Sequence, residues 1–157
     1  MIAVAGAEAV SICGGPTIQV PLGRLDAKER DPERSHLVRW QVPTPMSGRE
    51  LDPEGKLPEE TLDAFGLKQS FQTKGLSTQE LVALSGAHTI GNKGFGNPTV
   101  FDNTYFKILL DKTIFRRGIK GFVTLDHKVC RGPDTFFNDF KTAYLKLVNS
   151  GARWKSL

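Results

Sequence analysis

Cysteine is scarce in this sequence of 157 residues, which contains only two, Cys13 and Cys130. A secreted domain of this size often depends on several disulfides, and two isolated thiols cannot supply them. Neither thiol belongs to a Cys-x-x-Cys pair, which argues against a zinc site or a thioredoxin-like motif. We therefore expect an intracellular protein that works in a reducing compartment.

Long hydrophobic runs are also missing. The most apolar stretch, Met1–Cys13, contains Glu8 and is shorter than the roughly 20 residues that a membrane-spanning helix needs. It has no basic leader, so we do not interpret it as a signal peptide. The overall composition, 39% hydrophobic and 24% charged, is that of one globular domain, and no membrane partner is expected.

The charge pattern gives little indication of a nucleic-acid partner. The net charge is +4, but the only notable basic cluster is Arg116, Arg117 and Lys120. A nucleic-acid interface usually needs a larger basic patch with interleaved aromatic residues. We interpret the charge as a solvated basic surface and expect no nucleic-acid binding.

Helical patterns dominate the chain and predict a mostly α fold. Ser77-Thr78-Gln79-Glu80 is a capping box directly before an apolar run, and it predicts a helix that continues to about His88. Thr17–Leu22 is a short extended run. The other helices are expected over Met1–Ser11, Leu62–Gln72, Phe101–Leu110 and Thr135–Val148, the last with Phe136, Phe137, Phe140, Tyr144 and Leu147 as its core stripe.

Residues Asp26–Glu60 are expected to form a long irregular loop. Seven charged residues lie between Asp26 and Arg34, and five prolines fall between Pro32 and Pro58. Such a segment buries too little apolar surface to offset its ordering entropy. Asp31-Pro32-Glu33 recurs as Asp52-Pro53-Glu54, which fits either an insertion over 34–51 or chance repetition of common loop residues.

His88 is the residue with the strongest chemical potential. On the capped helix it shares a face with Leu81, Leu84 and Ser85, at helical spacings. A histidine in this position can be a metal or haem ligand. It can equally be a satisfied core histidine or a cap at the negative end of the helix dipole. Spacing alone leaves these alternatives open.

The run from Glu80 to Gly91, ELVALSGAHTIG, resembles the proximal signature of plant-type haem peroxidases. Further pieces in the same order resemble the family, namely GAEAV (6–10) with GGP (14–16) and VPLGR (20–24), FDNTYF (101–106) and FFNDF (136–140). The last piece and the low cysteine content favour the ascorbate peroxidase-related branch, in the cytoplasm or chloroplast. The resemblance implies that residues 1–157 form the C-terminal, proximal half of a haem-peroxidase helical fold.

The resemblance also implies a cofactor site. His88 would be the iron ligand of haem b, with Ser85 and Pro21 near the cofactor and Asp126 as the carboxylate on the other imidazole nitrogen. An ordinary surface aspartate fits the loose match around Asp126 equally well. Oxygen ligands for a potassium or calcium ion would be Thr89, Asn97 and Asp102, of which Thr89 and Asp102 also fit as plain capping residues.

The implied activity is reduction of hydrogen peroxide by a small reductant. Peroxide cleavage in the family needs a distal Arg-x-x-aromatic-x-x-His helix, and this sequence contains no such motif. The family's proximal tryptophan is also missing, with Gly94 near its place. The alternative is therefore a truncated, non-catalytic peroxidase-fold protein that binds haem weakly or not at all.

Limited proteolysis tests the expected loop. We predict that a protease used at low concentration first cuts within Asp26–Glu60, because this segment has the highest density of charge and proline. Mass spectrometry of the early fragments identifies the cut. Early cleavage between Leu81 and His88 would contradict the assignment of a stable helix there.

Overall fold

The computed structural model describes residues 1–25, 58, 62–92, 96–110 and 132–155. Within these ranges the secondary structure is helical, and the only β pairing is an isolated bridge between Arg24 and Trp154. The mostly α fold predicted from the sequence is therefore confirmed for the described part of the chain. The expected loop Asp26–Glu60, apart from Pro58, and Asp126 lie outside the described residues.

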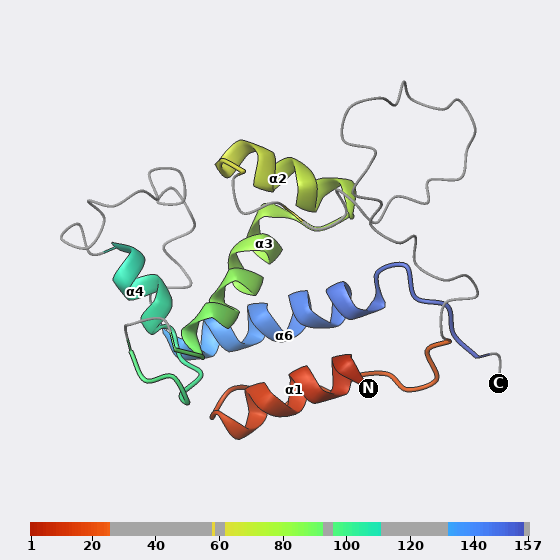
Figure 1. The fold of residues 1–157 in the computed structure, drawn as a ribbon, viewed down its shortest axis with the longest axis horizontal. Coiled ribbons are helices and arrows are strands. Elements are labelled where there is room, and N and C mark those ends of the chain that lie inside the picture. The colour runs from red at the N-terminus through yellow and green to blue at the C-terminus, as the bar shows by residue number, and fades with distance from the viewer. Residues whose placement is uncertain (26–57, 59–61, 93–95, 111–131, 156–157) are drawn as a thin grey trace, which may run out of the picture.

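The helices pack around one long central helix. The elements are α1 (Ile2–Ile12), α2 (Ala64–Thr73), α3 (Thr78–Ser85), the short 3-10 helix η1 (Gly86–Thr89), α4 (Thr104–Leu110) and α6 (Pro133–Asn149). In Figure 1, α1 runs alongside α6, and the C-terminal end of α3 meets the N-terminal part of α6 near α4.

Helix α1 ends in a glycine turn that also anchors the segment before α4. The N–H of Gly15 donates to the carbonyl of Val10 at 2.9 Å, and Gly14 has φ +84°, which favours glycine. The carbonyl of Cys13 accepts a hydrogen bond from the N–H of Phe101 at 2.7 Å. Residues 88 positions apart in the sequence are thereby joined.

The core stripe of α6 differs from the predicted one in that it includes Ala143 and leaves out Leu147. Phe136, Phe140 and Ala143 are buried at spacings of four and three residues, with exposed fractions of 0%, 1% and 0%. Tyr144 is half-buried and its hydroxyl donates to the carbonyl of Ala3 at 2.7 Å. Leu147 was expected in the core and is 42% exposed, because it lies one turn beyond this contact, past the first turn of α1.

Aromatic rings connect α6 with the segment around α4. The ring of Phe101 lies 5.1 Å from that of Phe136 and 4.8 Å from that of Phe140, between ring centroids. Phe106 packs edge-on against Phe136 at 5.2 Å. The expected helix from Phe101 in fact begins at Thr104, and Phe101 is 1% exposed just before it. Burial of these large rings dominates the core.

The extended run Thr17–Leu22 forms no strand, although Ile18 is buried. Backbone hydrogen bonds to the C-terminal segment begin only after Leu22. Lys155 N donates to the carbonyl of Gly23 at 2.9 Å, and Leu25 N donates to that of Arg153 at 2.8 Å. Arg24 also donates to the carbonyl of Val148 at 2.6 Å, at the C-terminal end of α6. These bonds hold the segment after α1 beside the end of α6.

A glycine is needed at position 86 because there is no room for a side chain, and not because of the backbone conformation. Its φ of −62° is ordinary for a helix, but a Cβ built there would overlap the ring of Phe136 and touch that of Phe106. The backbone at the end of α3 can therefore lie directly on the aromatic core.

We predict that Gly86→Ala lowers the free energy of unfolding by about 1–3 kcal/mol, because the added methyl group overpacks the Phe136 ring. Urea unfolding followed by circular dichroism measures the change. Gly66→Ala within α2 is the matched control, since the nearest atom to its Cβ is the flexible end of the Leu62 side chain. Equal losses in both variants would contradict the steric explanation.

Candidate functional site

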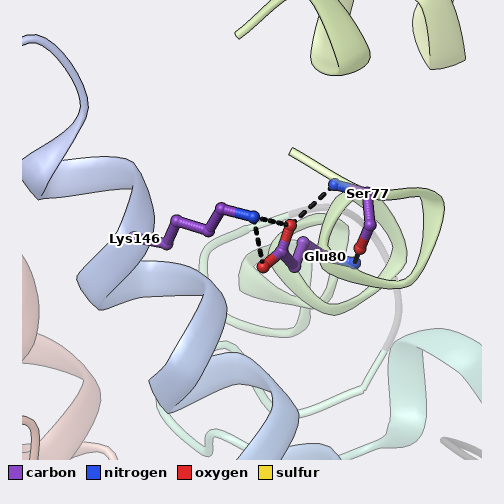
Figure 2. A network of polar contacts seen from close by, with 3 residues as sticks. All are labelled: Ser77, Glu80 and Lys146. Carbon is purple, nitrogen blue, oxygen red and sulfur yellow. Dashed lines mark hydrogen bonds and ion pairs between the residues drawn. The ribbon is translucent and has the colours of Figure 1, made fainter. Parts of the chain in front are cut away.

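The helix that carries the site begins with the capping box that the sequence predicted. Ser77 Oγ accepts from Glu80 N at 3.2 Å, and Glu80 Oε2 accepts from Ser77 N at 2.6 Å. Two of the unpaired N–H donors at the start of α3 are satisfied in this way. Figure 2 shows the two residues facing each other across the first turn.

An ion pair ties this first turn to α6. Lys146 Nζ lies 2.9 Å from Glu80 Oε1 and 2.8 Å from Glu80 Oε2 (Figure 2). Burial alone would raise the pKa of Glu80, but hydrogen bonds from Lys146 and Ser77 and the charge of Lys146 outweigh it and lower the pKa. The Lys146 side chain is 46% exposed, so the pair contributes at most about 1 kcal/mol. Its main effect is to fix the direction of α3 on α6.

His88 lies in the 3-10 turn that follows α3. The α-helix ends at Ser85, and η1 continues the chain with a tighter winding of about three residues per turn. His88 therefore does not lie on the same face as Leu81, as α-helical spacing had predicted. Leu81 and Thr89 are buried, whereas His88 is exposed. The imidazole is directed away from the core at the end of a rigidly anchored helix.

Tyr105 is the neighbour of His88 that sequence reasoning missed as a site residue. The two ring centroids are 5.8 Å apart, with the planes tilted by 40°. Burial raises the pKa of the Tyr105 hydroxyl, and a side-chain hydrogen bond with Ser85 partly opposes this. Ser85 also donates to the carbonyl of Val82 at 2.7 Å. The predicted residues Ser85 and His88 are thus joined through Tyr105 of α4, whose helical spacing had indicated only a core role.

Two of the three predicted cation ligands come together. Thr89 Oγ1 donates to Asp102 Oδ1 at 2.8 Å. The same oxygen accepts from Thr104 N at 2.9 Å, and Asp102 Oδ2 accepts from Thr104 Oγ1 at 2.8 Å. The cluster caps the start of α4 and binds it to η1.

Asn97, the third predicted ligand, makes a separate turn. Its Oδ1 accepts from Thr99 N at 3.0 Å and from Thr99 Oγ1 at 2.9 Å. Within the described ranges no group of three or more histidine, cysteine, aspartate or glutamate side chains is placed to hold a metal ion. The arrangement here is that of the capping alternative for Thr89 and Asp102.

Asp102 is held in its ionised form. Burial is the largest influence and acts to raise its pKa, but hydrogen bonds from Thr104 and Thr89 and the charge of Lys107 together lower the pKa below its ordinary value. A hydrogen-bonded carboxylate at the start of a helix also interacts favourably with the helix dipole. Tyr105 is the second residue of α4. The charge of Asp102 therefore contributes to keeping Tyr105 beside His88.

Pro21 lies away from His88. Arg24, three residues after Pro21, bonds to Val148 at the C-terminal end of α6, whereas Gly86 packs on Phe136 in its first turn. The 17 residues of α6 span about 25 Å at 1.5 Å per residue. Pro21 itself is exposed. The described residues thus place Ser85 near His88 and Pro21 at the other end of α6.

The donor chemistry at His88 fits an axial haem ligand. His88 is an exposed residue on an anchored turn, and imidazole is a common haem ligand. Among the described residues, His88 is the one that fits as a point of attachment for haem. Asp126, His36 and His127 lie outside the described ranges. In the part of the chain that the structure covers, no helix is both long and apolar enough to cross a membrane.

Comparison with known proteins identifies the family. The family model named Peroxidase matches residues 1–97, from α1 through the turn that carries His88. The chain belongs to the peroxidase family. It is 52% identical over 174 aligned positions to the Arabidopsis thaliana protein named "Putative L-ascorbate peroxidase 6", covering 100% of this chain and 46% of that protein. The resemblance noted in the sequence is thereby confirmed.

Other relatives agree. The Arabidopsis thaliana "L-ascorbate peroxidase 2, cytosolic" is 33% identical, over 94% of this chain and 59% of that protein. The Oryza sativa subsp. indica "L-ascorbate peroxidase 1, cytosolic" is 34% identical, with the same two coverages. The chain thus spans about half the length of the curated relatives it matches.

The lowered pKa of Asp102 predicts a specific acid sensitivity. A group whose folded pKa is depressed stabilises the fold above its unfolded pKa, near 3.8, and loses this contribution as pH falls through the folded value. We predict that Asp102→Asn loses less stability than the wild type as the pH falls from about 4 through the folded pKa of Asp102, which lies below 3.8. Urea unfolding at several pH values measures this, with Glu8→Gln on the exposed face of α1 as a charge-matched control. If the stability of Asp102→Asn fell with decreasing pH as steeply as that of the wild type, the role given to the Asp102 charge would be contradicted.

Proposed function

We propose that this chain is a haem peroxidase-like protein of the ascorbate peroxidase-related type, with His88 as the proximal haem ligand. The observation that supports this best is the exposed imidazole of His88 at the end of a capped helix, inside the region that matches the peroxidase family. Hydrogen peroxide would be the oxidising substrate and ascorbate or another small reductant the electron donor. The cofactor would be haem b, and the cytosolic relatives favour an intracellular site of action.

The residues of this chain would position the ligand. The Gly86 backbone rests on Phe136, which fixes the start of the 3-10 turn, and the ring of Tyr105 limits the orientations open to the imidazole. When bound, the haem supplies the iron at which hydrogen peroxide is reduced. A preorganised ligand loses less conformational entropy on binding than a histidine in a flexible loop.

Asp126 would accept a hydrogen bond from the second imidazole nitrogen. A carboxylate partner of this kind fixes the tautomer of the ring and makes the other nitrogen more electron-donating. Asp126 lies outside the described residues, so this role rests on the match of Val123-Thr124-Leu125-Asp126 to the family pattern. The cation site at Thr89, Asn97 and Asp102 is the corresponding proposal for a potassium or calcium ion.

The second candidate function is a non-catalytic peroxidase-fold protein. One specific observation favours it: the sequence has no Arg-x-x-aromatic-x-x-His segment, so it supplies no distal base and distal cation of that pattern. His36 follows Arg30 by six residues, but Glu33 stands where the aromatic residue belongs. In this case the residues 1–157 would keep the fold of a partial peroxidase domain without efficient turnover.

Haem titration distinguishes the ligand. We predict that the wild-type chain, titrated with haem, gives the absorption and electron paramagnetic resonance spectra of histidine-ligated iron, and that His88→Ala abolishes them. His36→Ala and His127→Ala serve as matched controls and should retain the spectra. Retention of histidine ligation in His88→Ala would show that another residue holds the iron.

Turnover then separates the two candidate functions. Each missing distal group is expected to slow the reaction by about 10²–10⁴-fold, so the haem-loaded chain should be far slower than a complete relative. The comparison uses equal haem, several reductants and a haem–imidazole control. A rate no higher than this control favours the non-catalytic candidate, whereas a rate well above it that falls in His88→Ala favours the peroxidase.

A further inference from the structure

Tyr105 contacts the chain on both sides of the junction between α3 and the 3-10 turn. Its hydroxyl is hydrogen-bonded to the side chain of Ser85, the last residue of α3. Its ring lies 5.8 Å from that of His88, between ring centroids. Ser85 and His88 are three residues apart, and the helical winding changes between them. The Tyr105 side chain therefore joins the end of α3 to the turn that carries the histidine.

The hydrogen bond between the two hydroxyls has a defined direction. Ser85 Oγ donates its single proton to the carbonyl of Val82 at 2.7 Å. Because a serine hydroxyl has one O–H and two acceptor positions, the neutral Tyr105 hydroxyl is the donor to Ser85 Oγ. Tyr105 is thereby linked through Ser85 to the last turn of α3, directly before the turn of His88.

The Tyr105 ring is also supported from its own helix. The ring of Phe106 lies 5.2 Å away, between ring centroids, in an edge-on arrangement, and Phe106 packs in the same way against the buried Phe136. Tyr105 is half-buried, whereas His88 is exposed. A half-buried ring that is bonded at its tip has fewer orientations than an exposed one, so Tyr105 restrains His88 and not the reverse.

We propose that Tyr105 is a positioning residue for His88, and that its hydroxyl, through the hydrogen bond to Ser85, holds the imidazole in the orientation in which it binds its ligand. This inference rests on the proposed function of His88 as the haem ligand. The hydroxyl ties the Tyr105 ring to the helix that precedes the histidine, so the imidazole meets a surface of fixed orientation. Phenylalanine keeps the ring but lacks this bond, and it should not replace tyrosine here.

The experiment compares Tyr105→Phe with the matched control Tyr144→Phe in the full chain of 157 residues. Both tyrosines are half-buried and hydrogen-bonded, but Tyr144 donates to the carbonyl of Ala3 in α1. In haem titrations we expect Tyr105→Phe to raise the dissociation constant about two- to tenfold, the effect of leaving one side chain free before binding. The resonance Raman band of the iron–histidine stretch should broaden or shift. Tyr144→Phe should leave both at their wild-type values.

Ser85→Ala tests the hydroxyl pair itself. It removes the acceptor of the same hydrogen bond, so it should change the Raman band as Tyr105→Phe does. The double variant Ser85→Ala, Tyr105→Phe should show no further change, because effects that pass through one shared bond do not add. Additive effects, or a band that changes in Tyr105→Phe but not in Ser85→Ala, would overturn the proposal.

A haem-free measurement separates this inference from the proposed function. In the chain with isotope-labelled histidine, nuclear magnetic resonance identifies the His88 ring signals as those that His88→Ala lacks. We expect Tyr105→Phe to move these signals toward the shifts of a free histidine and to increase the mobility of the ring in relaxation measurements. Unchanged His88 signals would overturn the inference even where haem binds through His88. If the wild type binds no haem, the proposed function fails, and the haem-free signals decide whether Tyr105 positions the ring.

Discussion

The contact between the backbone of Gly86 and the ring of Phe136 determines the position of every element around the candidate site. Phe136 also packs against Phe101 and Phe106, so one buried ring joins the end of α3, the segment before α4, and α4 itself to α6. Phe101 in turn bonds through its N–H to Cys13 at the end of α1. Because interiors are close-packed, a shift of this ring moves all of its neighbours together.

The exposure of His88 follows from this contact. With Gly86 fixed on the core, the tighter winding of the 3-10 turn places Thr89 inside, where it bonds to Asp102, and directs His88 outward beside Tyr105. The ion pair of Glu80 with Lys146 fixes the other end of α3 on the same helix α6. His88, the proposed haem ligand, is thus carried by a segment held at both ends, which is the support that a precisely placed ligand needs.

Local signals in the sequence were sufficient for the helices but not for the contacts between them. The capping box at Ser77, the glycines that end α1 and the aromatic stripe of α6 each act within a few residues, and the structure contains all three. The exposure of Leu147 and the place of Tyr105 beside His88 depend on partners far away in the chain. Family resemblance had placed Thr89 and Asp102 in one possible cation site, whereas periodicity could not have indicated that they lie together.

The C-terminal end of α1 is connected to the turn that carries His88 through the same aromatic core. Ile12 ends α1 next to Cys13, which bonds to Phe101, and Phe101 packs on the ring that supports Gly86 two residues before His88.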